Sequence, residues 1–186
     1  MLYSELQCSD AIHKAVERMG FAEMTEIQEK TIPVMMAGHD VIAKAPTGTG
    51  KTCAFGIPVA EHILPENKYP QAVIMAPTRE LAQQIAEELT QLTYFMPEVE
   101  VACVYGGANM EKQAKRLAEG CQIVVATPGR LMDHYKHHNI DLSHVTQIVL
   151  DEADEMLNMG FYKDVRHIIE MMKNRKSLSM FSATIS

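Results

Sequence analysis

Six short apolar runs alternate with longer amphipathic segments, and this alternation constrains the fold more than any other feature of the sequence. The runs cover 41–44, 72–76, 99–105, 122–126, 147–150 and 178–181. Helix-like patterns cover 51–62, 79–94, 110–118, 128–137 and 161–172. Apolar strands that alternate with helices are typical of a parallel sheet covered on both faces. We therefore predict an α/β domain with three layers, α/β/α, around a mostly parallel, twisted sheet.

Two helical segments precede this alternation. Ser9 or Asp10 can cap a first helix that ends at Gly20, and Thr25 can cap a second helix, in which Pro33 can introduce a kink. The whole chain has 186 residues, enough for one domain with its own core.

Charge and cysteine usage argue against several classes of protein. The net charge of −7 disfavours a protein that holds nucleic acid by bulk positive charge, although it leaves room for a local phosphate site. Four widely spaced cysteines without a C-x-x-C pattern disfavour a disulfide framework or a zinc ribbon, and fit reduced thiols in the cytosol. The sequence has neither a signal peptide nor an apolar stretch of about 18 residues, so we expect no membrane contact.

Residues suited to chemistry gather after the carboxyl ends of the expected strands, where ligands bind in open parallel sheets. These segments read APTGTGKT (45–52), PTRE (77–80), YGG (105–107), TPGR (127–130), DEAD (151–154) and SAT (182–184). The connections at the opposite ends read AGHD, PENKYPQ, AEGC and MKNRK. One edge of the sheet is therefore predicted to carry the functional site.

The segment APTGTGKT has the P-loop pattern G-x-x-x-x-G-K-[ST], except that Ala45 replaces the first glycine and must take an ordinary φ. Gly48 and Gly50 allow the backbone to curl, so that its N–H groups face an anion at a helix N-terminus. Lys51 would reach the β and γ phosphates of a nucleotide, and the Thr52 hydroxyl would ligate Mg²⁺.

Two acids follow the run 147–150. Asp151 fits the strand-end acid that faces the Mg²⁺ of a P-loop site, and Glu152 can orient or deprotonate an attacking water. The alternative is a helix N-terminus that carries acids because its dipole favours them. We expect Asp154 to organise its neighbours rather than to touch the metal.

In this order, the motifs resemble the N-terminal RecA-like domain of DEAD-box RNA helicases (superfamily 2) over nearly the whole chain. GFAEMTEIQ (20–28) resembles the Q motif, APTGTGKT motif I, PTRELAQQ motif Ia, YGG the GG motif, TPGR motif Ib, DEAD motif II and SAT motif III. Tyr3 stands where the family has an isolated aromatic residue, and Met24 replaces the usual proline of the Q motif. The resemblance implies a RecA-like ATP-binding domain over 37–186, with a helical Q-motif segment over 1–36 packed on it.

The resemblance implies that ATP and Mg²⁺ are the cofactors. Gln28 would read the adenine edge, although Thr25 and Gln28 also fit a capping box. A side-chain amide offers one donor and one acceptor, which suits adenine N6 and N7 but not the two acceptors of guanine. The implied nucleotide-binding residues are Phe21, Gln28, Ala45, Thr47, Gly48, Thr49, Gly50, Lys51 and Thr52. The implied Mg²⁺ ligands are Thr52 and Asp151, and the implied catalytic residues are Lys51, Asp151, Glu152, Ser182 and Thr184.

The resemblance also implies an RNA-binding surface beside the ATP site. Its residues would be Pro77, Thr78, Arg79, Gly107, Thr127, Pro128, Gly129 and Arg130. Hydroxyls, backbone N–H groups and guanidinium groups would hold phosphates and sugars, so recognition would be independent of base sequence, and the 2′-OH would distinguish RNA from DNA. From the residues alone, PTRE and TPGR could be simple helix starts, with Thr127 as N-cap and Pro128 at N1, and SAT a solvated strand end.

His134, His137 and His138 lie within one helical turn and could catch a metal, but the sequence places no acidic or cysteine partner beside them. We expect a packed or solvated helix instead.

The resemblance further implies a second RecA-like domain, which carries arginine fingers and half of the RNA groove and has no motif in these 186 residues. An arginine finger increases the rate of phosphoryl transfer by about 10³–10⁵-fold. We therefore expect these residues alone to bind nucleotide weakly and turn over little ATP, whereas the parent helicase couples hydrolysis to RNA clamping and local unwinding. We expect a cytoplasmic monomer. Two alternatives stay open: a nucleotide-binding scaffold fragment, and a P-loop NTPase that acts on a target other than RNA.

Overall fold

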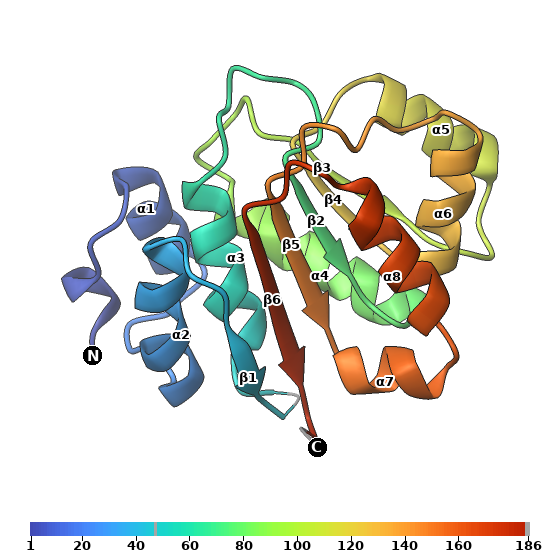
Figure 1. Cartoon of the computed structure of the whole chain (residues 1–186). Coiled ribbons are helices and arrows are strands. Elements are labelled where there is room, and N and C mark those ends of the chain that lie inside the picture. Colours follow the sequence, from blue (N-terminus) through green and yellow to red (C-terminus); the bar gives the residue numbers. More distant parts are fainter. Residues whose placement is uncertain (47, 185–186) are drawn as a thin grey trace.

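Six strands form one twisted sheet in the order β1-β6-β5-β2-β4-β3, and every neighbouring pair is parallel (Figure 1). The computed structural model describes residues 1–46 and 48–184. The strands are β1 (Ile42–Lys44), β2 (Ala72–Met75), β3 (Val101–Val104), β4 (Ile123–Ala126), β5 (Gln147–Asp151) and β6 (Ser177–Ser182). All six lie at or within the predicted runs, apart from one residue added at the end of β5 and one at each end of β6.

Helices cover both faces of the sheet, so the expected three layers are confirmed (Figure 1). One layer holds α1 (Asp10–Arg18), α2 (Glu26–Met36), α3 (Lys51–Glu61) and α4 (Arg79–Leu92). The other holds α5 (Met110–Ala118), α6 (Pro128–Lys136), α7 (Ala153–Asn158) and α8 (Tyr162–Met171). A 3₁₀ turn, η1 (Tyr3–Glu5), precedes α1.

Alternate residues of each central strand enter different cores, which explains why the runs are apolar throughout. In β2, Ile74 packs in the core beneath α1–α4, whereas Val73 and Met75 pack in the core beneath α5–α8. In β4, Val125 and Val124 divide in the same way. Both faces of β2 and of β4 are buried, and neither strand contains a polar residue.

The helix starts follow the expected capping chemistry. Ser9, rather than Asp10, is the N-cap of α1, and its hydroxyl accepts a hydrogen bond from the Ile12 N–H. Thr25 caps α2, which continues past Pro33 to Met36. The short helix α7 and the turn η1 were not predicted, because neither is long enough to show a helical period.

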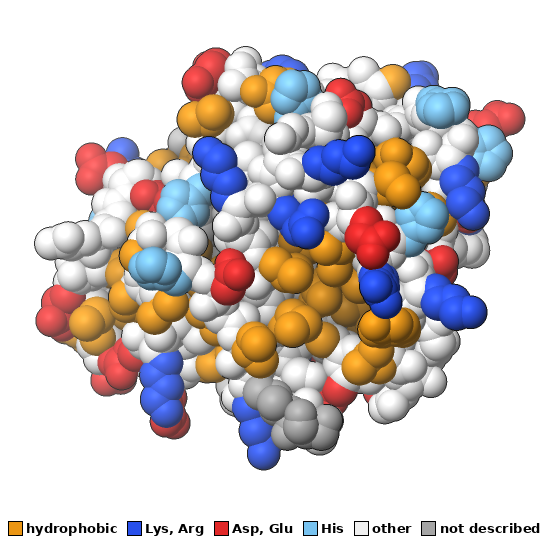
Figure 2. All heavy atoms as spheres, in the orientation of Figure 1, with side chains coloured by type: hydrophobic (Ala, Val, Ile, Leu, Met, Phe, Trp, Pro, Cys, Tyr) orange, Lys and Arg blue, Asp and Glu red, His pale blue; other side chains and the backbone are white. Residues whose placement is uncertain are grey.

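Figure 2 shows apolar side chains gathered on one face of the molecule. A hollow of about 470 Å³ lies on α7, α8 and β6. It is lined by Leu150, Ala153, Met156, Leu157, Tyr162, Val165, Arg166, Ile169, Glu170, Arg175, Leu178 and Met180. Its lining is mainly apolar, in contrast to the polar segments at the strand ends.

Within residues 1–46 and 48–184, no helix has both the length and the apolar character to cross a membrane. All four cysteines are free thiols.

The strand order decides which motifs meet. Because β6 lies between β1 and β5, its carboxyl end separates the segment after β1 from the acids after β5. The Ala45 N–H donates to the Ser182 carbonyl over 2.8 Å, and Asp151 lies in register with Phe181. The motifs APTGTGKT, DEAD and SAT are therefore brought to one edge of the sheet.

Candidate functional site

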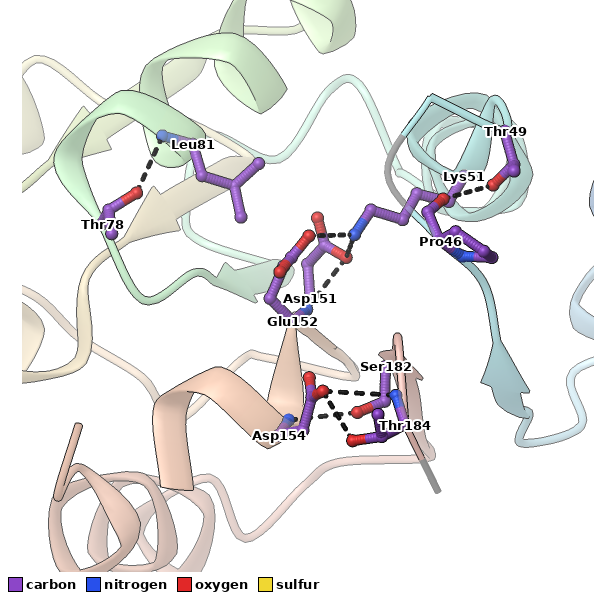
Figure 3. A network of polar contacts seen from close by, with 10 residues as sticks. All are labelled: Pro46, Thr49, Lys51, Thr78, Leu81, Asp151, Glu152, Asp154, Ser182 and Thr184. Carbon is purple, nitrogen blue, oxygen red and sulfur yellow. Dashed lines mark hydrogen bonds and ion pairs between the residues drawn. The ribbon is translucent and has the colours of Figure 1, made fainter. Parts of the chain in front are cut away.

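Lys51, the first residue of α3, points toward the two acids that follow β5 (Figure 3). Its Nζ atom lies 3.1 Å from Asp151 Oδ1 and 2.6 Å from Glu152 Oε1. Lys51 and Asp151 are buried. The structure therefore brings the P-loop lysine and the predicted Mg²⁺-facing acid into direct contact.

Burial and charge oppose each other in this cluster. Burial raises the pKa of the Asp151 carboxyl above its ordinary value, and the Lys51 ammonium offsets only part of this effect. Burial disfavours the charge on Lys51, but the carboxylates of Asp151 and Glu152 hold the pKa of Lys51 above its ordinary value. Lys51 therefore stays protonated at neutral pH.

One oxygen of this cluster fits a metal ion. Asp151 Oδ2 is buried and has no hydrogen-bond partner among the described residues. A carboxylate oxygen with unused lone pairs is the ligand type that Mg²⁺ prefers. Thr52 lies half-buried in the first turn of α3, next to Lys51. The residues present therefore fit the predicted Mg²⁺ site.

Glu152 is held in a backbone conformation that glutamate rarely adopts. Its φ of 54° and ψ of 48° lie in the left-handed region. Its N–H donates to Asp151 Oδ1 over 3.0 Å, and its carboxylate pairs with Lys51. Such a conformation costs about 1–3 kcal/mol and persists only where the surroundings hold it, most often at functional sites.

The described part of the P-loop has the predicted backbone. Gly48 and Gly50 take φ values of 85° and 79°. Ala45 has an ordinary φ, since only His138 and Glu152 have a positive φ among the described non-glycine residues. The loop is closed by the Thr49 hydroxyl, which donates to the Pro46 carbonyl over 2.6 Å (Figure 3). Thr47 lies outside the described residues.

Gln28 joins α2 to the P-loop. Its Oε1 accepts a hydrogen bond from the Thr25 N–H at 3.0 Å and one from the Tyr3 hydroxyl, so the capping box is confirmed. Its Nε2 donates to the Gly50 carbonyl over 3.0 Å. Phe21 stacks near the Tyr3 ring, with 6.4 Å between centroids, and 42% of Phe21 is exposed. Gln28 is thus in direct contact with the predicted P-loop.

The substitution Gly50→Ala is expected to displace Gln28 and to lower the free energy of unfolding by about 2–3 kcal/mol. A Cβ atom at this position would lie 2.5 Å from Gln28 Nε2, and the φ of 79° is unfavourable for alanine. Gly48→Ala is the matched control, because its φ is 85° but nothing lies within 4 Å of the added Cβ. Gly48→Ala should lose only about 1–2 kcal/mol, the backbone cost. Urea unfolding of both variants measures the difference, and equal losses would show that the contact with Gln28 has no energetic weight.

Asp154 organises the SAT segment, as expected (Figure 3). Its N–H donates to Ser182 Oγ over 3.1 Å, and its Oδ2 accepts from the Thr184 N–H and hydroxyl at 3.2 and 2.9 Å. Burial acts to raise the pKa of Asp154, but the hydrogen bonds with Ser182 and Thr184 outweigh it and hold that pKa below its ordinary value. Motifs II and III are therefore linked through Asp154.

The segment PTRE begins α4 at the same edge of the sheet. Thr78 is the N-cap, and its hydroxyl accepts from the Leu81 N–H over 3.2 Å. Pro77 is buried, whereas Arg79 is exposed. The Arg79 guanidinium lies over the Tyr105 ring, 4.7 Å from its centroid, which links PTRE to YGG.

Thr127 and Arg130 hold the YGG loop. Thr127 and Pro128 occupy the N-cap and N1 positions of α6, as predicted, but the Thr127 hydroxyl makes no capping bond. It instead accepts from the Gly106 N–H over 3.3 Å. Arg130 was predicted to be a phosphate-binding fork, yet its side chain is only 13% exposed and its Nη1 donates to the Ala108 carbonyl over 3.0 Å. Gly129 is half-buried beside it, and the exposed Gly107 has a φ of 80°.

His134 packs inside its helix layer. Its Nε2 lies 3.0 Å from Gln113 Oε1, and its Nδ1 lies 3.1 Å from Asn139 Nδ2. Burial, followed by the charge of Arg130, lowers the pKa of His134. No group of three or more His, Cys, Asp or Glu suited to a metal occurs in the described part of the chain. The histidine is thus part of a polar network that sequence patterns do not reveal, and Gln113 was missed for the same reason.

The chain is similar to several known proteins. A family model described as DEAD/DEAH box helicase matches residues 25–186. ATP-dependent RNA helicase CshA from Limosilactobacillus reuteri is 50% identical over 185 residues, which cover 100% of this chain and 37% of that protein. DEAD-box ATP-dependent RNA helicase CshA from Geobacillus kaustophilus is 46% identical and covers 98% of this chain and 39% of that protein. The crystal structure of a DEAD box protein from the hyperthermophile Methanococcus jannaschii is 41% identical with a TM-score of 0.92, covering 100% of this chain and 51% of that one. The chain therefore spans less than half the length of these curated relatives.

Proposed function

The chain belongs to the DEAD/DEAH box helicase family, and from this we propose that its 186 residues form the ATP- and RNA-binding N-terminal half of the core of an RNA helicase. The contact of Lys51 with Asp151 and Glu152 carries this proposal, because it unites a phosphate-binding group with acids suited to Mg²⁺. We assign 1–36 as the Q-motif segment and 37–186 as the RecA-like ATP-binding domain.

In the proposed site, Lys51 would exchange its contact with the two acids for contact with the β and γ phosphates of ATP. Thr52 and Asp151 would hold Mg²⁺, which would neutralise charge that develops on the phosphates. Glu152 would orient the attacking water and accept its proton. The positive φ of Gly50 supports backbone contact with the phosphates.

The adenine specificity is assigned to Gln28 and Phe21. Tyr3 and Thr25 donate to Gln28 Oε1 while Nε2 faces the Gly50 carbonyl, so the orientation of the amide is fixed. The exposed ring of Phe21 offers an apolar face on which adenine can pack.

Calorimetric titration tests this assignment. Mg-ADP is expected to bind to the chain at least about tenfold more tightly than Mg-GDP, since guanine would leave an amide hydrogen bond unmade. Gln28→Ala should bring the two affinities together. Gln84→Ala is the control, because Gln84 is an exposed glutamine of α4. Equal binding of both nucleotides would contradict the role of Gln28. Failure to bind either would mean that the site needs its second domain or that the chain acts as a scaffold.

The RNA surface is assigned to the segments PTRE, YGG and TPGR, with Arg79 as its exposed cation. Contacts from hydroxyls, backbone N–H groups and a guanidinium group would be independent of base sequence. A P-loop NTPase with a different target would bind nucleotide but not an oligoribonucleotide.

We propose that a second RecA-like domain completes both sites and supplies the arginine fingers, so that the whole protein couples ATP hydrolysis to RNA clamping and local unwinding. The 186 residues by themselves would then turn over little ATP. The much greater length of the relatives supports this proposal. The four free thiols support a cytoplasmic setting, in which we place the protein as a monomer.

A further inference from the structure

Gln113, on α5, contacts two of the segments that form the proposed RNA surface, YGG and TPGR. Its side chain is buried, with 8% of the residue exposed. Its Nε2 donates to the Tyr105 carbonyl over 3.0 Å. Its Oε1 accepts from Arg130 Nη1 at 3.2 Å and lies 3.0 Å from His134 Nε2. A single carboxamide thus joins the end of β3 to the first two turns of α6.

The partners of His134 fix the direction of these hydrogen bonds. A neutral imidazole donates through one ring nitrogen and accepts through the other. Asn139 Nδ2 lies 3.1 Å from Nδ1 and can only donate, so Nδ1 accepts. The proton therefore sits on Nε2 and points at Gln113 Oε1. The three hydrogen bonds of the Gln113 amide are therefore consistent, with Nε2 as donor to Tyr105 and Oε1 as acceptor from Arg130 and His134.

The YGG loop depends on such external bonds for its position. Gly106 and Gly107 are exposed and have no side chains that could anchor the loop, and Gly107 has a φ of 80°. The loop is held by Thr127 Oγ1 at the Gly106 N–H and by Arg130 at the Ala108 carbonyl. Gln113 is the residue that bonds both to the loop backbone and to Arg130.

We propose that Gln113 is a positioning residue of the RNA surface, which holds the YGG loop in register with the start of α6. The inference rests on the proposed function and deepens it. A glycine loop that is ordered before binding loses less conformational entropy when its backbone meets a phosphate. Gln113 acts through the loop and Arg130 and needs no contact with RNA.

The test uses Gln113→Met, which keeps the length and volume of the side chain and removes the amide. Binding of a fluorescent oligouridylate to the chain is measured at low salt. We expect an affinity about tenfold weaker, the effect of losing an ordered buried hydrogen bond, while the affinity for Mg-ADP changes less than about twofold. Hydrogen exchange at the amides of residues 106–109 should become faster.

Gln71→Met is the matched control for a purely structural effect. Gln71 is also a buried glutamine, and it holds the loop at the opposite edge of the sheet through Leu64 and Asn67. We expect this variant to lose thermal stability, as Gln113→Met does, with unchanged oligouridylate binding. His134→Gln keeps an N–H that can donate to Gln113 and should retain binding, whereas His134→Leu should not.

The possible results distinguish failure of the proposed RNA binding from failure of the proposed role of Gln113. If the unaltered chain binds no oligouridylate, the RNA-binding part of the proposed function fails, and this inference fails with it. If the unaltered chain binds and Gln113→Met binds equally well with unchanged exchange, only the inference is overturned. Should Gln113→Met not fold, equal binding by His134→Gln and His134→Leu overturns the inference, and a loss in His134→Leu alone supports it.

Discussion

Replacing Lys51 with methionine is expected to weaken Mg-ADP binding by about ten- to a hundredfold. A charge-assisted hydrogen bond contributes about 1.5–3 kcal/mol, and a tenfold change in affinity corresponds to about 1.4 kcal/mol. Methionine keeps the length of the side chain but cannot donate to a phosphate. Calorimetry against the unaltered chain measures the effect. Unchanged affinity would mean that the P-loop does not bind nucleotide, and would favour the scaffold alternative.

The same substitution is expected to destabilise the fold, because it leaves the buried Asp151 without its cation. Breaking one side of a buried ion pair costs about 3–5 kcal/mol when the remaining group stays charged. Asp151 can instead take up a proton, since burial already raises its pKa above 3.8. The free energy of unfolding, measured with urea, therefore depends on pH.

The sign of this dependence follows from linkage. A carboxyl whose pKa is higher in the folded than in the unfolded state binds a proton more readily when folded, so stability falls as pH rises above the unfolded pKa. Without Lys51 the folded pKa of Asp151 rises further. The loss in the free energy of unfolding caused by Lys51→Met should thus be smallest near pH 4 and grow toward neutral pH. The double variant, with Lys51→Met and Asp151→Asn, is the control. Its loss in the free energy of unfolding should depend much less on pH. A deficit that is equal at all pH values in both variants would exclude the buried charge as the cause.

The substitution Phe55→Ala is expected to lower the free energy of unfolding by about 3–5 kcal/mol, as is usual when a large buried aromatic is truncated. Phe55, on α3, and Phe181, on β6, are fully buried, with ring centroids 5.3 Å apart. They join the helix that begins at Lys51 to the strand that ends at Ser182. The cavity that this truncation leaves would loosen the packing of α3 against β6. We therefore also expect weaker nucleotide binding.

Urea unfolding of Phe55→Ala and of Phe95→Ala measures this core contribution. Phe95 is 40% exposed and lies edge-on to Tyr94, with 5.0 Å between ring centroids, so its truncation should cost about 1 kcal/mol or less. Similar losses in the two variants would show that the Phe55–Phe181 contact does not anchor the site.

Much of this fold could be predicted because its determinants are local. Strands buried on both faces must be apolar throughout, and each turn of an amphipathic helix repeats its pattern, so all six strands and the longer helices were found. The glycines of the P-loop and the N-cap Thr25 follow from backbone chemistry within a few residues. Ala45 was correctly expected to take an ordinary φ because a Cβ atom restricts it. Only α7 and η1, each shorter than two helical turns, gave too little pattern to predict.

The sequence by itself therefore determined the strands, the longer helices, the predicted edge of the site and the family. Only the tertiary structure decided which side chains meet there. It placed β6 between β1 and β5, paired Lys51 with Asp151, and set Gln28 against Gly50. It also bonded Arg130 to the YGG loop, and gathered it with His134 around Gln113. The physical reason is that periodicity and caps act over one or two turns of chain, whereas these contacts join residues far apart and depend on strand order and packing, which no local pattern encodes.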